Sequence, residues 1–274
     1  MTRLADSIKS TRLLPEQCGM WYLGQEGFLL KQNDSYILVD PYLSDYVDRN
    51  CSQLVKWERL YPAPIDPSEL DFIDLVICTH EHYDHADPET LAAIATASPA
   101  AHFVVPAPIV SALSSYGIAE DKIISARADE PIIYKGSKIF PIPSAHEELH
   151  SDENGDYFEL GYIIENEAGR FFHAGDMCLY DGLEERLCGI DVALLPINGR
   201  DYYRNSLDII GNFTAEEAIM LSKHIGADLL IPMHYDLYEI NRVSATAFVN
   251  ALERLSPLQK THLFTPGEKY IYTK

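Results

Sequence analysis

Short apolar runs separated by turn residues fill the start of the chain. Residues 20–24, 28–31 and 36–40 are apolar, and the turns between them contain Gly or Asn, a pattern typical of a β-meander. Beyond a proline-rich loop at 57–70, apolar strands alternate with segments of helical periodicity. We expect strands at 74–79, 102–105, 132–134, 138–143, 157–165, 170–173, 191–195, 229–232, 262–264 and 269–272, and helices at 86–98, 109–116, 214–226 and 244–255.

Capping residues mark the ends of two predicted helices. Asp87 is expected to be the N-cap of the first long helix, with Pro88 as its first residue. Thr214 and Glu217 have the spacing of a capping box, and Gly226 is expected to end that helix. The alternation of strands and capped helices predicts a layered α/β fold.

Four apolar strands end abruptly in polar residues of the kind that bind ligands. These residues are His80, Asp176, Asn198 and His234. In open α/β sheets, ligands bind beyond the carboxyl ends of the strands. The four strand ends are therefore candidates for one common rim.

The segment 79–85 has the sequence T-H-E-H-Y-D-H, which places three imidazoles and an aspartate directly after a buried strand. Imidazole nitrogens and carboxylate oxygens suit Zn²⁺, Mn²⁺ or Fe²⁺. His80 and His82 are two residues apart and can point the same way, so they are candidates for one ion. Asp84 and His85, at the turn into the next helix, are candidates for a second.

This motif, H80-x-H82-x-D84-H85, resembles the metal motif of the metallo-β-lactamase superfamily, whose fold is a four-layer αββα sandwich. Further superfamily elements follow in order along the chain: Asp40 in ILVDPYL, His146 in PSAHEEL, Asp176 in HAGDM and His234 in PMHYD. Within the superfamily, HAGD, DVALLPI and IPMHYD look most like the branch that includes L-ascorbate-6-phosphate lactonase.

The resemblance implies a site for two divalent ions, with zinc or manganese expected and iron also compatible. His80, His82 and His146 would bind the first ion, Asp84, His85 and His234 the second, and Asp176 would bridge them. Asp40 would accept a hydrogen bond from a ligand imidazole and fix its tautomer. Every position has a residue of the right type.

The reaction implied by this resemblance is metal-dependent hydrolysis, in which a metal-bridging hydroxide attacks a small carbonyl substrate. Asp176 and Asp84 are the expected catalytic carboxylates. A lactonase-like activity on a sugar or sugar-phosphate lactone is the leading hypothesis. A phosphodiesterase or nuclease of the same superfamily, and a non-catalytic metal-binding protein, are the alternatives.

A substrate phosphate would be bound best by an arginine fork. The segment 199–204, G-R-D-Y-Y-R, offers Arg200, Arg204 and Tyr202 as candidate substrate contacts just beyond a predicted strand. The alternative is a surface loop in which Asp201 pairs with the arginines.

Charge and cysteine usage narrow the partners and the compartment. The chain has 21 Lys and Arg against 42 Asp and Glu, a formal net charge of −21, which disfavours nucleic acid and anionic membrane surfaces. The first 20 residues lack the apolar run of a secretory signal, and five cysteines form no CxxC pair. We therefore expect a cytoplasmic protein whose partner is a small-molecule substrate.

Length and composition fit one packed unit. Apolar residues make up 47% of the 274 residues, enough for a substantial core. Residues 1–274 are predicted to form a single metallo-β-lactamase-like hydrolase domain. Oligomeric state is left open, a homo-oligomer included.

Overall fold

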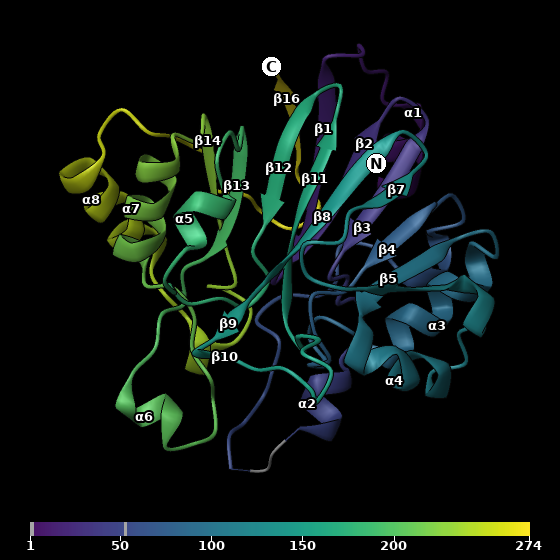
Figure 1. The fold of residues 1–274 in the computed structure, drawn as a ribbon, viewed down its shortest axis with the longest axis horizontal. Coiled ribbons are helices and arrows are strands. Elements are labelled where there is room, and N and C mark those ends of the chain that lie inside the picture. Colours follow the sequence, from purple (N-terminus) through teal and green to yellow (C-terminus); the bar gives the residue numbers. More distant parts are fainter. Residues whose placement is uncertain (1–2, 52–53) are drawn as a thin grey trace.

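The computed structural model describes residues 3–51 and 54–274. Two seven-stranded sheets pack face to face, and helices cover their outer sides (Figure 1). This arrangement is the predicted four-layer αββα sandwich.

The first sheet is built mainly from the N-terminal half of the chain and has the strand order β16-β1-β2-β3-β4-β5-β6. The predicted meander forms its antiparallel part, and β3 to β6 run parallel. The strands are β1 (Gln17–Gly24), β2 (Gly27–Gln32), β3 (Ser35–Val39), β4 (Leu75–Ile77), β5 (His102–Pro106), β6 (Ile123–Ala126) and β16 (Lys269–Thr273).

The second sheet has the order β15-β14-β13-β12-β11-β8-β7. Strands β12 to β15 are parallel, whereas β7, β8 and β11 are antiparallel to their neighbours. The strands are β7 (Ile132–Tyr134), β8 (Ser137–Pro143), β11 (Leu160–Asn166), β12 (Gly169–His173), β13 (Val192–Pro196), β14 (Leu229–Met233) and β15 (Lys260–Thr261); a separate short pair is β9 (Ala145–His146) and β10 (Glu148–Leu149).

Alternate residues of the first sheet pack in different cores. Phe28 and Ile77 belong to the core between the sheets, together with Phe172 of the second sheet. Leu29 and Val76, their neighbours in sequence, belong to the core under the helices of the first half. Because side chains alternate across a strand, a sheet covered on both faces must be apolar at consecutive positions.

Helices cover both outer faces, and two of them begin at the predicted caps. The Asp87 side chain accepts from the backbone N–H of Glu89 at the start of α3, and Thr214 and Glu217 form a capping box at the start of α7. The helices are α1 (Leu4–Ser10), α2 (Tyr46–Asn50), α3 (Pro88–Ala97), α4 (Val110–Ser115), α5 (Leu183–Arg186), α6 (Tyr202–Asn205), α7 (Ala215–Ile225) and α8 (Ala245–Leu255), with short 3₁₀ turns at Pro67–Glu69, Ala107–Ile109, Glu120–Lys122 and Glu239–Asn241.

The strand predicted at 262–264 is wrong. The chain leaves the sheet after Thr261, and the His262 and Phe264 rings pack against Tyr270 of β16 and Tyr22 of β1 instead. Strand β6 and the short helices α1, α2, α5 and α6 carry little periodicity and were not predicted. No helix in the described part of the chain is both long enough and apolar enough to cross a membrane.

Candidate metal centre

The site lies where both sheets present the ends of strands. His80 follows β4 of the first sheet, while Asp176, Asn198 and His234 follow β12, β13 and β14 of the second. The turn between β1 and β2 joins them, because the His234 backbone N–H donates to the Gln25 carbonyl at 3.0 Å. The predicted common rim therefore combines two sheets, and four of its residues come from loops far apart in sequence.

Two residues at the site, Asp40 and His234, have left-handed backbone conformations. Asp40 has φ 44° and His234 has φ 58°, a region that costs a non-glycine residue about 1–2 kcal/mol. Backbone hydrogen bonds hold both residues there, from Asp40 to Ile77 at 2.9 Å and from His234 to Gln25. Strain of this kind is concentrated at functional sites.

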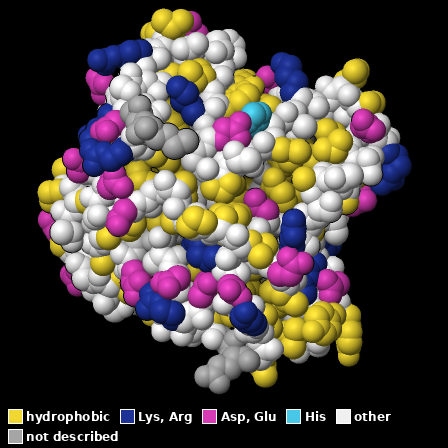
Figure 2. All heavy atoms as spheres, turned by 180° about the vertical axis from the view of Figure 1, so that it is seen from behind, with side chains coloured by type: hydrophobic (Ala, Val, Ile, Leu, Met, Phe, Trp, Pro, Cys, Tyr) yellow, Lys and Arg dark blue, Asp and Glu magenta, His cyan; other side chains and the backbone are white. Residues whose placement is uncertain are grey.

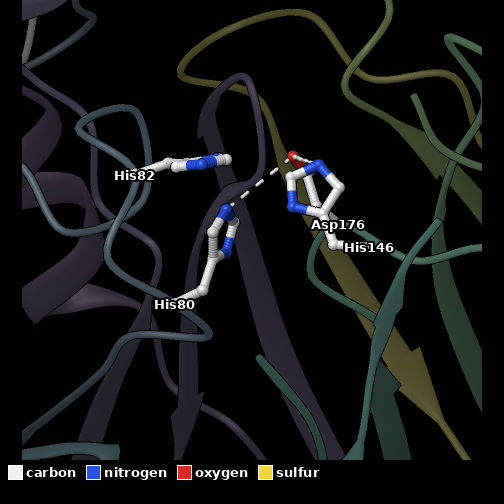
Figure 3. A group of neighbouring side chains, drawn as sticks. All are labelled: His80, His82, His146 and Asp176. Carbon is white, nitrogen blue, oxygen red and sulfur yellow. Dashed lines mark ion pairs between the residues drawn. The ribbon is translucent and has the colours of Figure 1, made fainter. Parts of the chain in front are cut away.

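Three imidazoles surround one carboxylate in the first group of candidate ligands. The ligand atoms of His80, His82, His146 and Asp176 all lie within 4.8 Å of one another (Figure 3). Asp176 Oδ2 is 3.8 Å from His80 Nε2 and 3.4 Å from His146 Nε2.

A second group adjoins the first and consists of Asp84, His85 and His234, again within 4.8 Å. Asp84 Oδ2 lies 3.7 Å from His85 Nε2 and 3.5 Å from His234 Nε2. Asp176 also faces this group, at 3.6 Å from His85 Nε2 and 3.2 Å from His234 Nε2. The structure thus brings all seven predicted ligands together, with Asp176 between the two groups.

The donor atoms fit divalent cations. Nε2 of His80, His85 and His146 is buried and has no hydrogen-bond partner among the described residues. An unsatisfied buried polar group costs about 1–3 kcal/mol, so three in one place call for a ligand. Neutral imidazoles and carboxylates are the donors that zinc, manganese and iron take.

The histidines of the first and the second group differ in their protonation. Burial lowers the pKa of His80 well below its ordinary value and that of His146 to about 4, so both are neutral with a lone pair available. Burial also acts to lower the pKa of His85 and His234, but the charges of Asp176 and Asp84 outweigh this effect. The pKa of His85 is therefore raised well above 6.5 and that of His234 to about 9. A cation at the second group would take the place of these protons.

Asp40 and Thr79 fix the tautomers of two candidate ligands. His85 Nδ1 donates to Asp40 Oδ2 at 2.8 Å, since a carboxylate only accepts. The Thr79 hydroxyl donates to the same oxygen at 2.6 Å and therefore accepts from His80 Nδ1 at 3.0 Å. Both rings consequently direct Nε2 at the site.

Two residues of the β1–β2 turn also lie beside the candidate ligands, and the sequence did not predict them as part of the site. Gln25 Nε2 donates to Asp84 Oδ2 at 2.8 Å and lies 3.1 Å from His234 Nε2. Glu26 is fully buried, with Oε2 3.8 Å from His85 Nδ1 and no hydrogen bond to either oxygen. Burial, followed by the charge of Asp176, raises the Glu26 pKa well above 4.5. In the sequence both lie inside an ordinary strand–turn–strand segment.

A cavity of about 500 Å³ opens over the candidate metal ligands. Asp84, His82, His146, Asp176 and His234 line its polar side. Its apolar side includes Val47, Trp57, Tyr116, Leu207, Ile209 and Tyr238. No Lys or Arg of the described residues lines the cavity.

The predicted substrate contacts at 199–204 lie outside the cavity lining. Arg200 forms a two-pronged ion pair with Glu217, at 2.7 Å for both bonds. Arg204 pairs with Asp201 at 2.6 Å, as the surface-loop alternative predicts, and donates to the Asn198 carbonyl. Tyr202 is 89% exposed. Asp201 caps α6, which contains Arg204, whereas Arg200 precedes the cap and pairs with Glu217 of α7.

The fold and the site define a class of protein: a metallo-β-lactamase-type sandwich with a cluster of His and Asp ligands at one edge. Residues 35–235 match the family described as the beta-lactamase superfamily domain, and the chain belongs to that family.

Several relatives span most of the chain. It is 28% identical over 243 residues to a UPF0173 metal-dependent hydrolase of Saccharolobus solfataricus, covering 85% of this chain and 90% of that protein. It is 27% identical over 267 residues to a UPF0173 metal-dependent hydrolase of Aeropyrum pernix, covering 91% and 95%.

Solved structures share the fold. Igni18, a metallo hydrolase of Ignicoccus hospitalis, has a TM-score of 0.68 at 23% identity over 94% of this chain and 99% of that one. An isothiocyanate hydrolase from Delia radicum gut bacteria has a TM-score of 0.74 at 17% identity, covering 93% of this chain and 100% of that one. At such identities these likenesses concern the fold alone.

Proposed function

We propose that the protein is a two-metal hydrolase that opens lactones or esters of small, uncharged carbonyl compounds carrying an apolar group. The observation that carries this proposal is the ligand cluster with unpaired buried Nε2 atoms, placed at one side of a cavity with apolar walls and no cationic lining. The names of the relatives support metal-dependent hydrolysis. The resemblance of the strand-end motifs to the ascorbate-6-phosphate lactonase branch supports the lactone class.

The chain would hold one ion with His80, His82 and His146, and the other with Asp84, His85 and His234. Asp176 would contact both. Divalent ions so held lower the pKa of water toward neutrality and stabilise negative charge on a carbonyl oxygen.

Asp176 and Asp84 handle the proton in this proposal. The histidines around them hold the pKa of each carboxyl below its ordinary value despite burial, so both are proton acceptors at neutral pH. Oδ1 of Asp176 accepts from Asn212 at 2.8 Å and lies 3.2 Å from His234 Nε2, whereas Oδ2 faces His80, His85 and His146. Asp176 Oδ2 is therefore the atom placed to take a proton from the attacking water.

The charge around the cavity favours an uncharged substrate. A phosphate group would bring negative charge to a wall that has Glu81 and Asp208 and no described cation. On the face shown in Figure 2, acidic side chains are interspersed with the basic ones and no continuous basic patch is visible among the described residues. These features weigh against the sugar-phosphate and nuclease alternatives.

The first test is elemental analysis and reconstitution of purified protein with Zn²⁺ or Mn²⁺. We expect about two ions per chain for the wild type, fewer for His82→Gln, and no change for the control His224→Gln, which alters an exposed histidine paired with Glu184. Less than one ion per chain after reconstitution would contradict the two-metal proposal.

The second test is a substrate screen of the reconstituted protein. We expect turnover of γ-lactones with alkyl chains, weaker turnover of sugar lactones, and none of sugar-phosphate lactones or phosphodiesters. Asp176→Ala should abolish turnover while the circular dichroism spectrum is unchanged. A preference for phosphodiesters would refute the proposed substrate class.

A further inference from the structure

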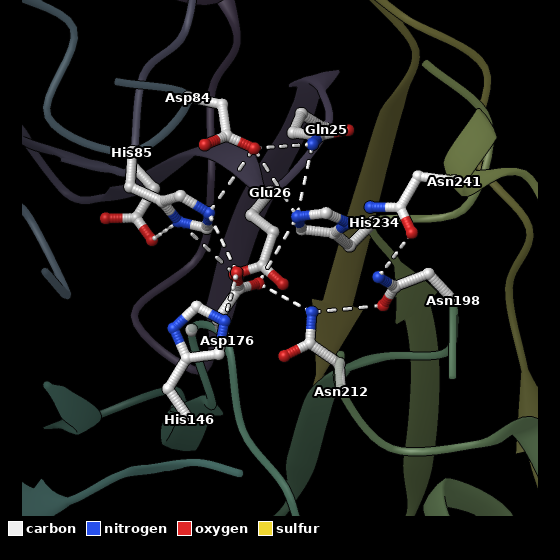
Figure 4. Close-up of polar contacts among 12 residues, drawn as sticks. Gln25, Glu26, Asp84, His85, His146, Asp176, Asn198, Asn212, His234 and Asn241 are labelled. Atoms are coloured by element: carbon white, nitrogen blue, oxygen red, sulfur yellow. Dashed lines mark hydrogen bonds and ion pairs between the residues drawn. The ribbon is translucent and has the colours of Figure 1, made fainter. Parts of the chain in front are cut away.

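Three buried amides connect the metal centre to an arginine. Asn212 Nδ2 donates to Asp176 Oδ1 at 2.8 Å and to Asn198 Oδ1 at 3.0 Å. Asn198 Nδ2 donates to Asn241 Oδ1 at 3.0 Å, and Arg204 Nη1 donates to that same oxygen at 2.7 Å. Figure 4 shows this chain of amides beside Asp176 and His234. We call Asn212, Asn198 and Asn241 the amide chain.

The two ends of the amide chain fix the direction of every hydrogen bond in it. The carboxylate of Asp176 only accepts, so Asn212 must present its nitrogen. The guanidinium of Arg204 only donates, so Asn241 must present its oxygen. The amide of Asn198 then has one orientation that satisfies both neighbours, and it is the one observed. The orientations of three amides follow from chemistry at the ends, without ambiguity between oxygen and nitrogen.

One hydrogen-bond donor at the cavity has no partner among the described residues. Asn241 Oδ1 accepts two hydrogen bonds, whereas Asn241 Nδ2 donates to none of the described residues. Asn241 is 8% exposed and lines the same cavity as Asp176 and His234. Figure 4 draws its nitrogen on the side of His234 and its oxygen on the side of Asn198. The Asn241 amide therefore brings an N–H donor without a partner among the described residues to the lining of the cavity.

We propose that Asn241 Nδ2 donates a hydrogen bond to the carbonyl oxygen of the substrate, and that Arg204 and Asn198 are positioning residues that hold it there. This inference rests on the proposed function, since it needs a carbonyl substrate. A donor oriented before the substrate arrives can stabilise developing negative charge without reorganisation. The positive charge of Arg204 on the same amide polarises the N–H further.

The decisive variant is Asn241→Asp. An aspartate keeps the oxygen that accepts from Arg204 and Asn198, but replaces the Nδ2 donor with an oxygen. If Asn241 served the structure alone, Asn241→Asp would retain activity and only Asn241→Ala would lose it. Our proposal expects both variants to lose about 10²–10³-fold in kcat on the best lactone, with ions per chain unchanged.

A binding measurement on metal-depleted protein gives a readout independent of turnover. The probe is 1-methyl-5-pentylpyrrolidin-2-one, a hydrolysis-resistant lactam that has a carbonyl acceptor and no N–H. We expect Asn241→Asp to bind it about 2–10-fold more weakly than the wild type, the loss of one hydrogen bond. Equal affinities, or no binding to the wild type, would overturn the inference.

The two proposals fail in different ways. If the lactam binds through Asn241 but no lactone or ester is turned over, the proposed reaction is wrong and the carbonyl donor stands. If lactones are turned over and Asn241→Asp is as active as the wild type, the proposed reaction stands and the role of Asn241 is wrong.

Discussion

Replacing Glu26 by Gln should make the metal-free protein more stable and the metal-bound protein less stable. Glu26 is 0% exposed, and neither carboxyl oxygen has a hydrogen-bond partner among the described residues. Burial, with Asp176 and Asp40 nearby, raises its pKa well above 4.5. Without a cation the folded protein therefore keeps this carboxyl protonated at a pH where the unfolded chain has released the proton.

The sign of the pH dependence follows from this difference. Between 4.5 and the folded-state pKa, the folded state binds one proton more than the unfolded state, so the free energy of unfolding falls as pH rises. One proton corresponds to about 1.4 kcal/mol per pH unit. Between 4.5 and the folded-state pKa, Glu26→Gln should therefore gain about 1.4 kcal/mol per pH unit relative to the wild type.

Urea unfolding of both metal-depleted proteins across this pH range measures the difference directly. His85 and His234 also have raised pKa values in both proteins, and because the Glu26 charge contributes to that of His234, the gap measures the Glu26 proton together with its effect on His234. Parallel profiles for the two proteins would refute the argument. In the metal-bound form the cations favour ionised Glu26, and losing this charge near His85 should weaken metal binding by about 10–100-fold.

Three further predictions concern two residues that surround the candidate ligands and one contact far from the site. Asp40→Asn replaces one of the two oxygens that accept from Thr79 and His85 with an N–H donor, and should lower metal affinity by about 10–100-fold in a competition titration. Gly175→Ala should lower the number of ions bound per chain, because Gly175 has φ 62° and an added Cβ would lie 2.6 Å from Thr79 Cβ; normal ion content would contradict this. Lys31→Met should destabilise the protein by about 3 kcal/mol in urea unfolding, because the buried ammonium donates to three carbonyls at the end of α1.

The sequence was most informative where structure depends on neighbours along the chain. The caps at Asp87 and Thr214 act over two or three residues, so their spacing alone identifies them. The ligand motif at 79–85 is equally local. Its remaining partners, His146 and His234, were placed through resemblance to a family, because no local rule relates loops of different sheets.

Residues that act through contacts between distant parts of the chain could not be predicted from the sequence. Gln25 contacts His234, 209 positions away, and the amide of Asn198 meets Asn241 43 positions away. Nothing in the sequence around Arg204 shows whether it binds a ligand or a protein amide, since a guanidinium suits both. Only the fold decides it, by placing the arginine against Asn241 and outside the cavity lining.

Groups that can only donate or only accept determine the chemistry on both sides of the cavity. Asp40 accepts from His85 Nδ1, which directs His85 Nε2 toward the candidate metal centre. Arg204 donates, which leaves Asn241 with an N–H toward the cavity. In the proposed function one side would bind cations and the other a carbonyl oxygen, and the fold orients both groups before any ligand binds. Substitution of Asp40 or Arg204 should therefore lower activity even though neither side chain lines the cavity.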